Sequence, residues 1–520
     1  MRKLFLLFFL ITPLLSQAQY DPQDIELGFG PLFSVSKRSV PTQFVGTDNT
    51  GFYVVYSRGK LGLGQKKLHK FGFDLKPQLD NELSRPIGGV RTQTEVVLLL
   101  KNKLYQISHG TSNVRRTFYV QSIDKETLKV GPEQQVGSFT TEGKSASKSQ
   151  TFITTTADSS YVGLIYTIPN RRKENERFAV HIFDAEMQEV WSQEYDFPYE
   201  NRLFDLQEFQ IDRRGDLYML AKRFFNVKRE QVEGAANYDY LLFNLKQQGG
   251  IDSLRIQSQG KFLRDMRVTF TPDGDIVSAD FYSDRSVDGA GGAYYMRLDG
   301  QSKEVKSSSF KPFEVDFLTQ NMTERKAKRV QKRKAKGRNV ELPFYYIDEL
   351  ISMPDGSIRM IGERRHVYTS IINSGGGVTT TITHYDYDDL VVVSISPAGE
   401  VDWANRIAKM QHTVDDNAAY SSYATMQRNN ELVLFFNDNA ENLLYDGVGR
   451  VAPMRKNSST VVMAAKVGQF GDVKRSGLFR RGEASIKIRP VFSHQLDNDE
   501  MLIFGHRQVR NQRFVILRFK

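Results

Sequence analysis

The most constraining feature of this sequence is a pair of β-hairpin signals that alternate along its whole length. The first signal is a polar turn followed by a run rich in β-formers, as in "TPDGDIVSADF" (271–281) and "MPDGSIRMIGE" (353–363). Turns of this kind before alternating apolar residues are typical of hairpins. The signal occurs eight times, first near Asn49 and last near Asn498.

The second signal is an apolar strand, a short turn and another strand. The only two tryptophans of the chain, Trp191 and Trp403, share this frame, and when they are aligned Ile395 falls on Phe183. The same frame recurs without tryptophan, which brings the number of copies to seven, at 245–253 and 467–475 and more loosely at 73–81, 123–131 and 298–306.

Two hairpins in each repeat make four strands, which is the size of a β-propeller blade. The eighth copy of the second hairpin is incomplete, because the chain ends on the apolar strand "FVILRFK" (514–520). The segment "IELGFGPLFSV" (25–35) can supply the missing strand and protect the sheet edge. We therefore predict an all-β chain with a single eight-bladed β-propeller over residues 19–520, closed by N- and C-terminal strands. Seven blades, or several β-sandwiches in a row, are the alternatives.

The N-terminal segment predicts export. Met1–Lys3 is basic, the run from Leu4 to Leu15 is apolar, and small residues precede Gln19. This is the pattern of a secretory signal peptide over residues 1–18, whereas a membrane span needs about 20 apolar residues. We expect a protein of the periplasm or cell envelope of a Gram-negative bacterium, with secretion as the alternative and no transmembrane span in the mature chain.

Composition excludes several kinds of site. The chain has no cysteine, so disulfides, thiolate metal sites and cysteine nucleophiles are absent. Its eight histidines are scattered along the sequence and form no zinc motif. We assign no catalytic residue, no cofactor and no metal ligand. Calcium is the one ion left open, because oxygen-rich segments occur at 384–389, 437–442 and 497–500.

Long loops are predicted on one face of the propeller. The second turn of most blades is long, and the longest is the segment 364–388. Binding residues concentrate on long loops carried by a rigid scaffold, so this face is the expected functional face.

The longest crossover, residues 314–342 between the fifth and sixth blades, is expected on the same face. Good helix formers run from Thr323 to Lys336, and residues 322–338 hold nine Lys or Arg against one acid, Glu324. This basic insertion, helical or disordered, is either a solvated tether or a docking element for an acidic partner. The predicted partners are envelope proteins or an anionic lipid or lipopolysaccharide surface, and not nucleic acid. The predicted binding residues are Arg325, Lys326, Lys328, Arg329, Lys332, Arg333, Lys334 and Lys336.

The turn Gly399-x-x-x-Trp403 resembles the tryptophan-docking motif of quinoprotein-type eight-bladed propellers. The segment from Phe183 to Trp191 keeps the tryptophan but has Met187 in place of the glycine. That family includes quinone-cofactor dehydrogenases, some with a vicinal disulfide that is impossible here, and an envelope scaffold of outer-membrane protein assembly. The leader ending "SQA" also resembles those of Bacteroidota, which export many uncharacterised propellers.

These features favour a non-catalytic binding scaffold of the cell envelope, because the residues that carry chemistry are scattered while loops and charge are concentrated. The alternative is a carbohydrate-active or quinone-dependent enzyme with its site in the propeller funnel. Three or more carboxylates or arginines that converge in the funnel would favour the enzyme.

Overall fold

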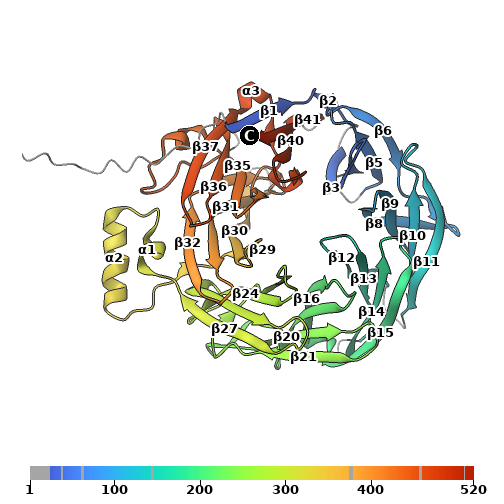
Figure 1. Cartoon of the computed structure of the whole chain (residues 1–520), viewed down its shortest axis with the longest axis horizontal. Coiled ribbons are helices and arrows are strands. Elements are labelled where there is room, and N and C mark those ends of the chain that lie inside the picture. Colours follow the sequence, from blue (N-terminus) through green and yellow to red (C-terminus); the bar gives the residue numbers. More distant parts are fainter. Residues whose placement is uncertain are drawn as a thin grey trace, which may run out of the picture.

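The computed structural model describes residues 24–36, 39–59, 64–141, 146–171, 173–373, 379–455, 459–508 and 510–520. The predicted signal peptide lies outside these residues. The described chain is dominated by antiparallel strands, whose sheets stand around a central axis (Figure 1). The predicted all-β propeller class is confirmed.

Four-stranded units follow one another along the first half of the chain. The first four sheets contain, in order, β3 (Ser39–Asp48), β4 (Gly51–Arg58), β5 (Lys66–Phe71) and β6 (Pro77–Glu82); β7 (Pro86–Ile87), β8 (Val90–Leu100), β9 (Lys103–Thr111), β10 (Arg115–Ile123) and β11 (Val130–Thr140); β12 (Thr151–Thr155), β13 (Tyr161–Thr167), β14 (Asn175–Asp184) and β15 (Glu189–Glu200); and β16 (Phe204–Ile211), β17 (Leu217–Phe224), β20 (Tyr238–Leu245) and β21 (Ile251–Ile256).

The second half continues the pattern. The fifth to eighth sheets contain β22 (Phe262–Leu263), β23 (Arg267–Phe270), β24 (Ile276–Ser283), β26 (Gly292–Leu298) and β27 (Val305–Pro312); β29 (Tyr346–Ser352), β30 (Ile358–Asn373), β31 (Thr379–Ile395), β32 (Val401–Ile407) and β33 (Gln411–Val414); β34 (Ala424–Arg428), β35 (Glu431–Asn439), β36 (Thr460–Val467) and β37 (Val473–Arg480); and β1 (Ile25–Phe29), β2 (Phe33–Ser34), β38 (Lys487–Ile488), β39 (His494–Gln495), β40 (Glu500–Gln508) and β41 (Asn511–Phe519).

The remaining elements are short connections. Two-stranded ladders join β18 (Gln231–Val232) to β19 (Ala235–Ala236) and β25 (Gly289–Ala290) to β28 (Leu342–Pro343). The helices are α1 (Val315–Thr319), α2 (Glu324–Ala335) and α3 (Arg481–Ala484), with 3₁₀ turns at η3 (Ala146–Lys148), η4 (Asn201–Leu203), η5 (Ala440–Leu444) and η6 (Pro490–Phe492).

In the first seven sheets the main strands run in chain order from the ring centre outward. In Figure 1, β3, β8, β12, β16 and β29 lie nearest the centre, and β6, β11, β15, β21, β27 and β32 lie at the rim. The apolar faces of consecutive sheets pack on each other. For example, Phe281 of the fifth sheet and Met360 of the sixth belong to one buried cluster. The core is therefore a series of layers between neighbouring sheets rather than a single central core.

Five of the seven outer hairpins share one turn geometry, and the turns at Leu128 and Lys303 are one residue longer. In the two tryptophan-containing copies, the residue that closes the turn has a positive φ, 59° at Met187 and 85° at Gly399. Both close the same bond, from the amide of this residue to the carbonyl three positions earlier. Only glycine adopts this conformation without strain, yet Met187 is buried in the core, where its side chain contributes apolar contact.

Each of the two tryptophans binds its own sheet to the next one. Trp191 donates from Nε1 to the Gly215 carbonyl of the fourth sheet at 2.9 Å, and Trp403 donates to the Gln469 carbonyl of the seventh at 3.0 Å. A Cβ on Gly471 would lie 2.7 Å from Cδ2 of Trp403, so this glycine lets the indole pack on the turn. The two tryptophans occupy equivalent outer strands, but they dock on different turns of the following sheet.

The termini meet in one sheet, in the pairing predicted from the sequence. β1 pairs antiparallel with β41, with Ile25 opposite Phe519 and Phe29 opposite Val515. β41 in turn pairs with β40, so the N-terminal strand becomes the outer strand of the eighth sheet. This pairing connects the two ends of the described chain through backbone hydrogen bonds.

The segment 364–388, predicted as a long loop, is mostly strand. β30 and β31 pair from Ile358 opposite Ile395 out to Asn373 opposite Thr379, with one register shift after Glu363. The prediction of a loop was wrong because the segment is rich in Thr, Tyr, Ile and Val, which favour strands even where one hairpin extends beyond its sheet.

We expect Trp191→Phe to lower the free energy of unfolding by about 2 kcal/mol, because the variant loses a buried hydrogen bond and part of an apolar contact. Trp403→Phe is the matched control: its side chain is more exposed, and we expect a loss below about 1 kcal/mol. Denaturant unfolding of the two variants and the parent measures the difference. Equal losses would show that the indole hydrogen bond to Gly215 contributes nothing specific.

Candidate functional site

The inner strands carry bulges that change which side chains face the centre of the ring. In β29, the pairing with β30 shifts between Ile347 and Glu349 and leaves Asp348 as the extra residue. In β8, the pairing with β9 shifts between Thr94 and Val96 and leaves Glu95. Bulges re-aim side chains and are common beside active sites. Two inner strands of the ring therefore present a carboxylate at a bulge.

Asp348 is the carboxylate with the more unusual surroundings. Its Oδ1 forms an ion pair with Nη2 of Arg365 at 2.9 Å, and its side chain is 16% exposed. Its Oδ2 is buried without a hydrogen bond of good geometry, as is the hydroxyl of Tyr423. Burial raises the pKa of Asp348 to about 7; Arg365 opposes this shift, while Glu363 and Glu349 add to it. Asp348 therefore holds a proton in part of the molecules at neutral pH.

The pKa of Glu95 is shifted in the opposite direction. Burial alone would raise its pKa, but the hydrogen bond and charge of His109 and the charge of Arg116 lower it overall. His109 lies 2.8 Å and Arg116 2.7 Å from the same Oε1. Two bulged carboxylates of one ring thus have pKa values moved in opposite directions by their partners.

We name Asp348, Glu349, Glu363, Arg365 and Tyr423 the Asp348 cluster. Glu363 forms a fully buried pair with Lys409, at 2.6 Å from Oε1 to Nζ, and accepts from the Ser422 hydroxyl at 2.8 Å. Glu349 accepts from the Thr425 hydroxyl of the next inner strand at 2.6 Å. These bonds hold both oxygens of Glu363 and one oxygen of Glu349.

Aromatic rings lie next to the cluster on the side where the inner strands begin. The Arg365 guanidinium lies 4.7 Å from the ring centre of Tyr346, and Arg264 lies 4.4 Å from that of Phe344. The Phe344 and Tyr346 rings meet edge to face at 4.8 Å. Stacked guanidinium and aromatic groups offer flat apolar surface beside hydrogen-bond donors.

Other central carboxylates hold the ring together. Glu208 accepts from the Val268 amide of the next sheet at 2.9 Å, and Asp265 accepts from the Ile347 amide at 2.8 Å. Each of these two carboxylates accepts from the backbone of an inner strand, which is the edge strand of its sheet. The carboxylates that converge in the centre are therefore divided between a structural role and the Asp348 cluster.

The sequence missed these groups because they come from distant segments. Glu363 and Lys409 are 46 residues apart, and Asp348 became the extra residue only through the register of β29. The one sequence signal that could have found the cluster is the pair of adjacent acids, Asp348 and Glu349, near the start of an inner strand. Three or more carboxylates or arginines that come together near the ring centre are the condition stated above for favouring an enzyme over a scaffold.

Three histidines, scattered in the sequence, also come together. His366 of β30 lies opposite Asp386 of β31, and the rings of His366, Tyr368, His384 and His412 follow one another at 5.1, 4.7 and 5.4 Å. Among the residues that the structure describes, no group of three or more His, Asp or Glu side chains is placed to hold a metal ion. This arrangement therefore identifies no site for calcium, the ion that the sequence analysis left open.

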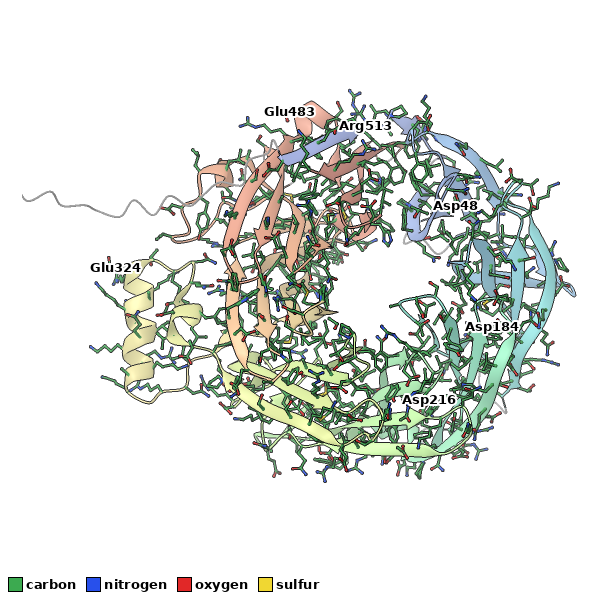
Figure 2. The ribbon with its side chains drawn as sticks, viewed as in Figure 1. Asp48, Asp184, Asp216, Glu324, Glu483 and Arg513 are labelled. Atoms are coloured by element: carbon green, nitrogen blue, oxygen red, sulfur yellow. The ribbon has the colours of Figure 1, made fainter. Side chains whose placement is uncertain are left out.

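The basic insertion lies at the rim, outside β32, rather than on the face of the long loops (Figures 1 and 2). All eight predicted binding residues fall on α2 or at its C-cap, and all but the partly buried Lys334 are exposed. Buried Phe317 and Leu318 of α1 anchor the insertion to the fifth and sixth sheets, whereas α2 has no buried residue. Among the described residues, no helix is long and apolar enough to cross a bilayer.

Comparisons with known proteins give no family. No family model matches the chain, and no curated protein matches it. Among solved structures, a PL25 ulvan lyase has a TM-score of 0.35 at 9% identity over 80% of this chain and 90% of its own. An α-L-arabinofuranosidase of Fusarium graminearum has a TM-score of 0.32 at 12% identity over 71% and 94%.

A puromycin-hydrolysing peptidase of Mycobacterium tuberculosis has a TM-score of 0.34 at 11% identity, and the match covers 80% of this chain but 52% of the peptidase. Two of these three proteins act on carbohydrates, yet at such TM-scores the likeness carries no argument about function. The propeller assignment stands on the strand pairings, and the resemblance to quinoproteins stays a prediction.

The raised pKa of Asp348 predicts a pH dependence of stability. Its carboxyl has a pKa of about 7 in the fold against an ordinary value of 3.8, so the folded state binds the proton more tightly. That contribution to stability is present below pH 3.8 and is lost as the pH rises through 7. Asp348→Asn is neutral throughout, so its melting temperature should fall less than that of the parent between mildly acidic and mildly alkaline pH. Parallel curves would contradict the assignment.

Proposed function

We propose that the Asp348 cluster is an acid–base site that acts on a carbohydrate. The observation that carries the proposal is a carboxyl with a pKa near 7 on a bulged inner strand of the ring, where Arg365 pairs with only one of its oxygens. A general acid works best when its pKa lies near the operating pH. The side chain of Asp348 is 16% exposed, so its carboxyl can be reached from the ring centre, although Oδ2 itself is buried near Tyr423.

The surroundings suit a substrate rich in hydroxyl groups. Arg365 donates hydrogen bonds, and Tyr346 with Phe344 supplies aromatic surface on which a sugar ring packs. In this proposal Asp348 gives its proton to the leaving oxygen as the glycosidic C–O bond breaks, and Arg365 stabilises the carboxylate that remains. Water then adds to the sugar carbon and returns a proton to Asp348. No quinone or other cofactor is needed for this step.

The test compares two buried acids. Asp348→Asn should lower the rate of bond cleavage by roughly 100-fold or more, since it removes a general acid. Glu176→Gln is the matched control, because burial also raises the pKa of Glu176 to about 7, but in β14 of the third sheet, which is not an inner strand. Released reducing ends and unsaturated products are measured on a panel of neutral and acidic polysaccharides. Equal rates in both variants would remove Asp348 from the chemistry.

A non-catalytic scaffold of the cell envelope is the second candidate, and the exposed cations of α2 favour it. Their one ion pair within the described residues joins Lys328 to Glu324, so the helix presents uncompensated positive charge at the rim. Such a surface suits the anionic lipid, lipopolysaccharide or acidic protein expected from the sequence.

Removing charge from α2 tests the scaffold. The variant with glutamine at Arg325, Arg329, Lys332 and Lys336 should bind anionic vesicles more than 10-fold more weakly, since each basic residue contributes about 1 kcal/mol near such a surface. Its melting temperature should not change, because these side chains are exposed. The control removes the same charge elsewhere on the surface, with glutamine at Lys101, Lys103, Arg171 and Lys474. Equal weakening in both variants would show that net charge, and not α2, governs binding.

Architecture and location complete the proposal. We assign one blade to each of the eight sheets of four or more strands in the described chain, with the eighth closed by β1 and the basic insertion between the fifth and sixth. The signal peptide predicted from the N-terminal sequence supports export to the periplasm or envelope.

A further inference from the structure

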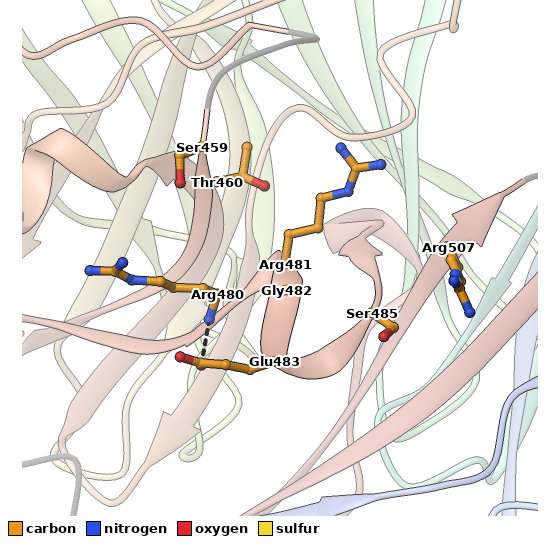
Figure 3. A pocket seen from close by; sticks show the side chains of 8 residues that line it. All are labelled: Ser459, Thr460, Arg480, Arg481, Gly482, Glu483, Ser485 and Arg507. Carbon is orange, nitrogen blue, oxygen red and sulfur yellow. Dashed lines mark hydrogen bonds between the residues drawn. The ribbon is translucent and has the colours of Figure 1, made fainter.

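An open pocket lies between the seventh and eighth sheets, on the side of the second turns and crossovers (Figure 3). Its volume is about 710 Å³. It is formed by the start of β36, the end of β37, the α3 turn and the outer end of β40. The residues that line it are Ser459, Thr460, Arg480, Arg481, Gly482, Glu483, Ser485 and Arg507.

Positive charge dominates the pocket. Arg480, Arg481 and Arg507 are exposed, and within the described part of the chain none of them forms an ion pair. The single acid of the lining, Glu483, accepts from the backbone amide of Arg480 at 2.8 Å. Most arginines elsewhere on the inner and middle strands face a carboxylate, so three unpaired guanidinium groups around one pocket are unusual for this protein.

A buried hydroxyl adds an independent observation. Thr460 is 4% exposed and lines the pocket, and its Oγ1 is buried without a hydrogen-bond partner. In Figure 3 this oxygen points to the side on which Arg481 lies. An unsatisfied buried hydroxyl costs free energy, which a ligand oxygen would recover.

The positive charge of the pocket affects the pKa of a neighbouring lysine, Lys487. Burial lowers the pKa of Lys487 to about 8, and the charge of Arg481 lowers it further than the carboxylate of Asp416 restores it. An anion bound beside Arg481 would reduce this repulsion.

We propose that this pocket binds the phosphate or sulfate ester of a sugar-sized ligand. A tetrahedral oxyanion accepts several charge-assisted hydrogen bonds, and guanidinium groups match it in charge and geometry. The hydroxyls of Thr460 and Ser485 provide neutral contacts beside the cations. The volume exceeds that of one inorganic anion, so the rest of the ligand occupies the remaining space. The pocket shares no residue with the Asp348 cluster, and the proposal is independent of the proposed enzyme activity.

Calorimetric titration tests the proposal with the full chain. The probes are glucose 6-phosphate, glucose 6-sulfate, inorganic phosphate, inorganic sulfate and neutral glucose, at low and high salt. We expect at least one ester to bind, more tightly than its inorganic anion, with affinity that falls as salt rises. The relative affinities of the two esters identify the preferred oxyanion.

The variants locate the binding. Arg481→Ala and Arg507→Ala should each weaken ester binding by roughly 10-fold or more, the effect of losing one hydrogen bond to a charged group. Thr460→Val keeps the shape of the side chain and breaks no bond in the free protein, so it should weaken binding without lowering the melting temperature. Arg329→Ala removes the same charge from α2 and should leave binding unchanged.

Three outcomes would overturn the proposal. The first is that none of the four anions binds. The second is that neutral glucose binds as tightly as its esters. The third is that Arg329→Ala weakens ester binding as much as Arg481→Ala does, which would mean that overall charge and not the pocket attracts the anion. Retained ester binding in Asp348→Asn would separate this site from the ring centre.

Discussion

The inner strand of every sheet is an edge strand, and the ring depends on satisfying its free backbone groups. Side chains of the neighbouring sheet do this at several junctions: Gln43 bonds both backbone groups of Val97, and Gln495 bonds both of Gln427. Glu208 and Asp265 serve the same purpose with carboxylate oxygens. A long polar side chain thus continues the ladder where no further strand fits, which blocks pairing with other chains and fixes the spacing between sheets.

This requirement explains why acidic residues gather at the centre of the ring without all being functional. A carboxylate that accepts a backbone amide is committed to the fold, and its removal would leave that amide unsatisfied. Asp348 differs because a bulge places it outside the ladder and because Arg365 engages only one of its oxygens. The strand register that builds the sixth sheet therefore also leaves Asp348 outside the ladder, with a raised pKa.

The two positively charged regions differ in what surrounds them. The cations of α2 stand on a helix at the rim that has no buried residue, and water screens them. Arg480, Arg481 and Arg507 border a pocket whose wall holds a buried, unbonded hydroxyl. The first arrangement suits an extended anionic surface, and the second suits a discrete anionic group.

The sequence by itself determined the propeller class, the alternating hairpins, the shared frame of Trp191 and Trp403, and the pairing of the first strand with the last. These features depend on local turn chemistry and on strand periodicity, which a single chain displays directly. Only the tertiary structure decided the length of the β30–β31 hairpin, the position of the basic insertion at the rim, the Asp348 cluster and the arginine pocket. Each of these depends on register between segments far apart in the chain, and a shift of one residue in a strand turns a side chain from one face of the sheet to the other.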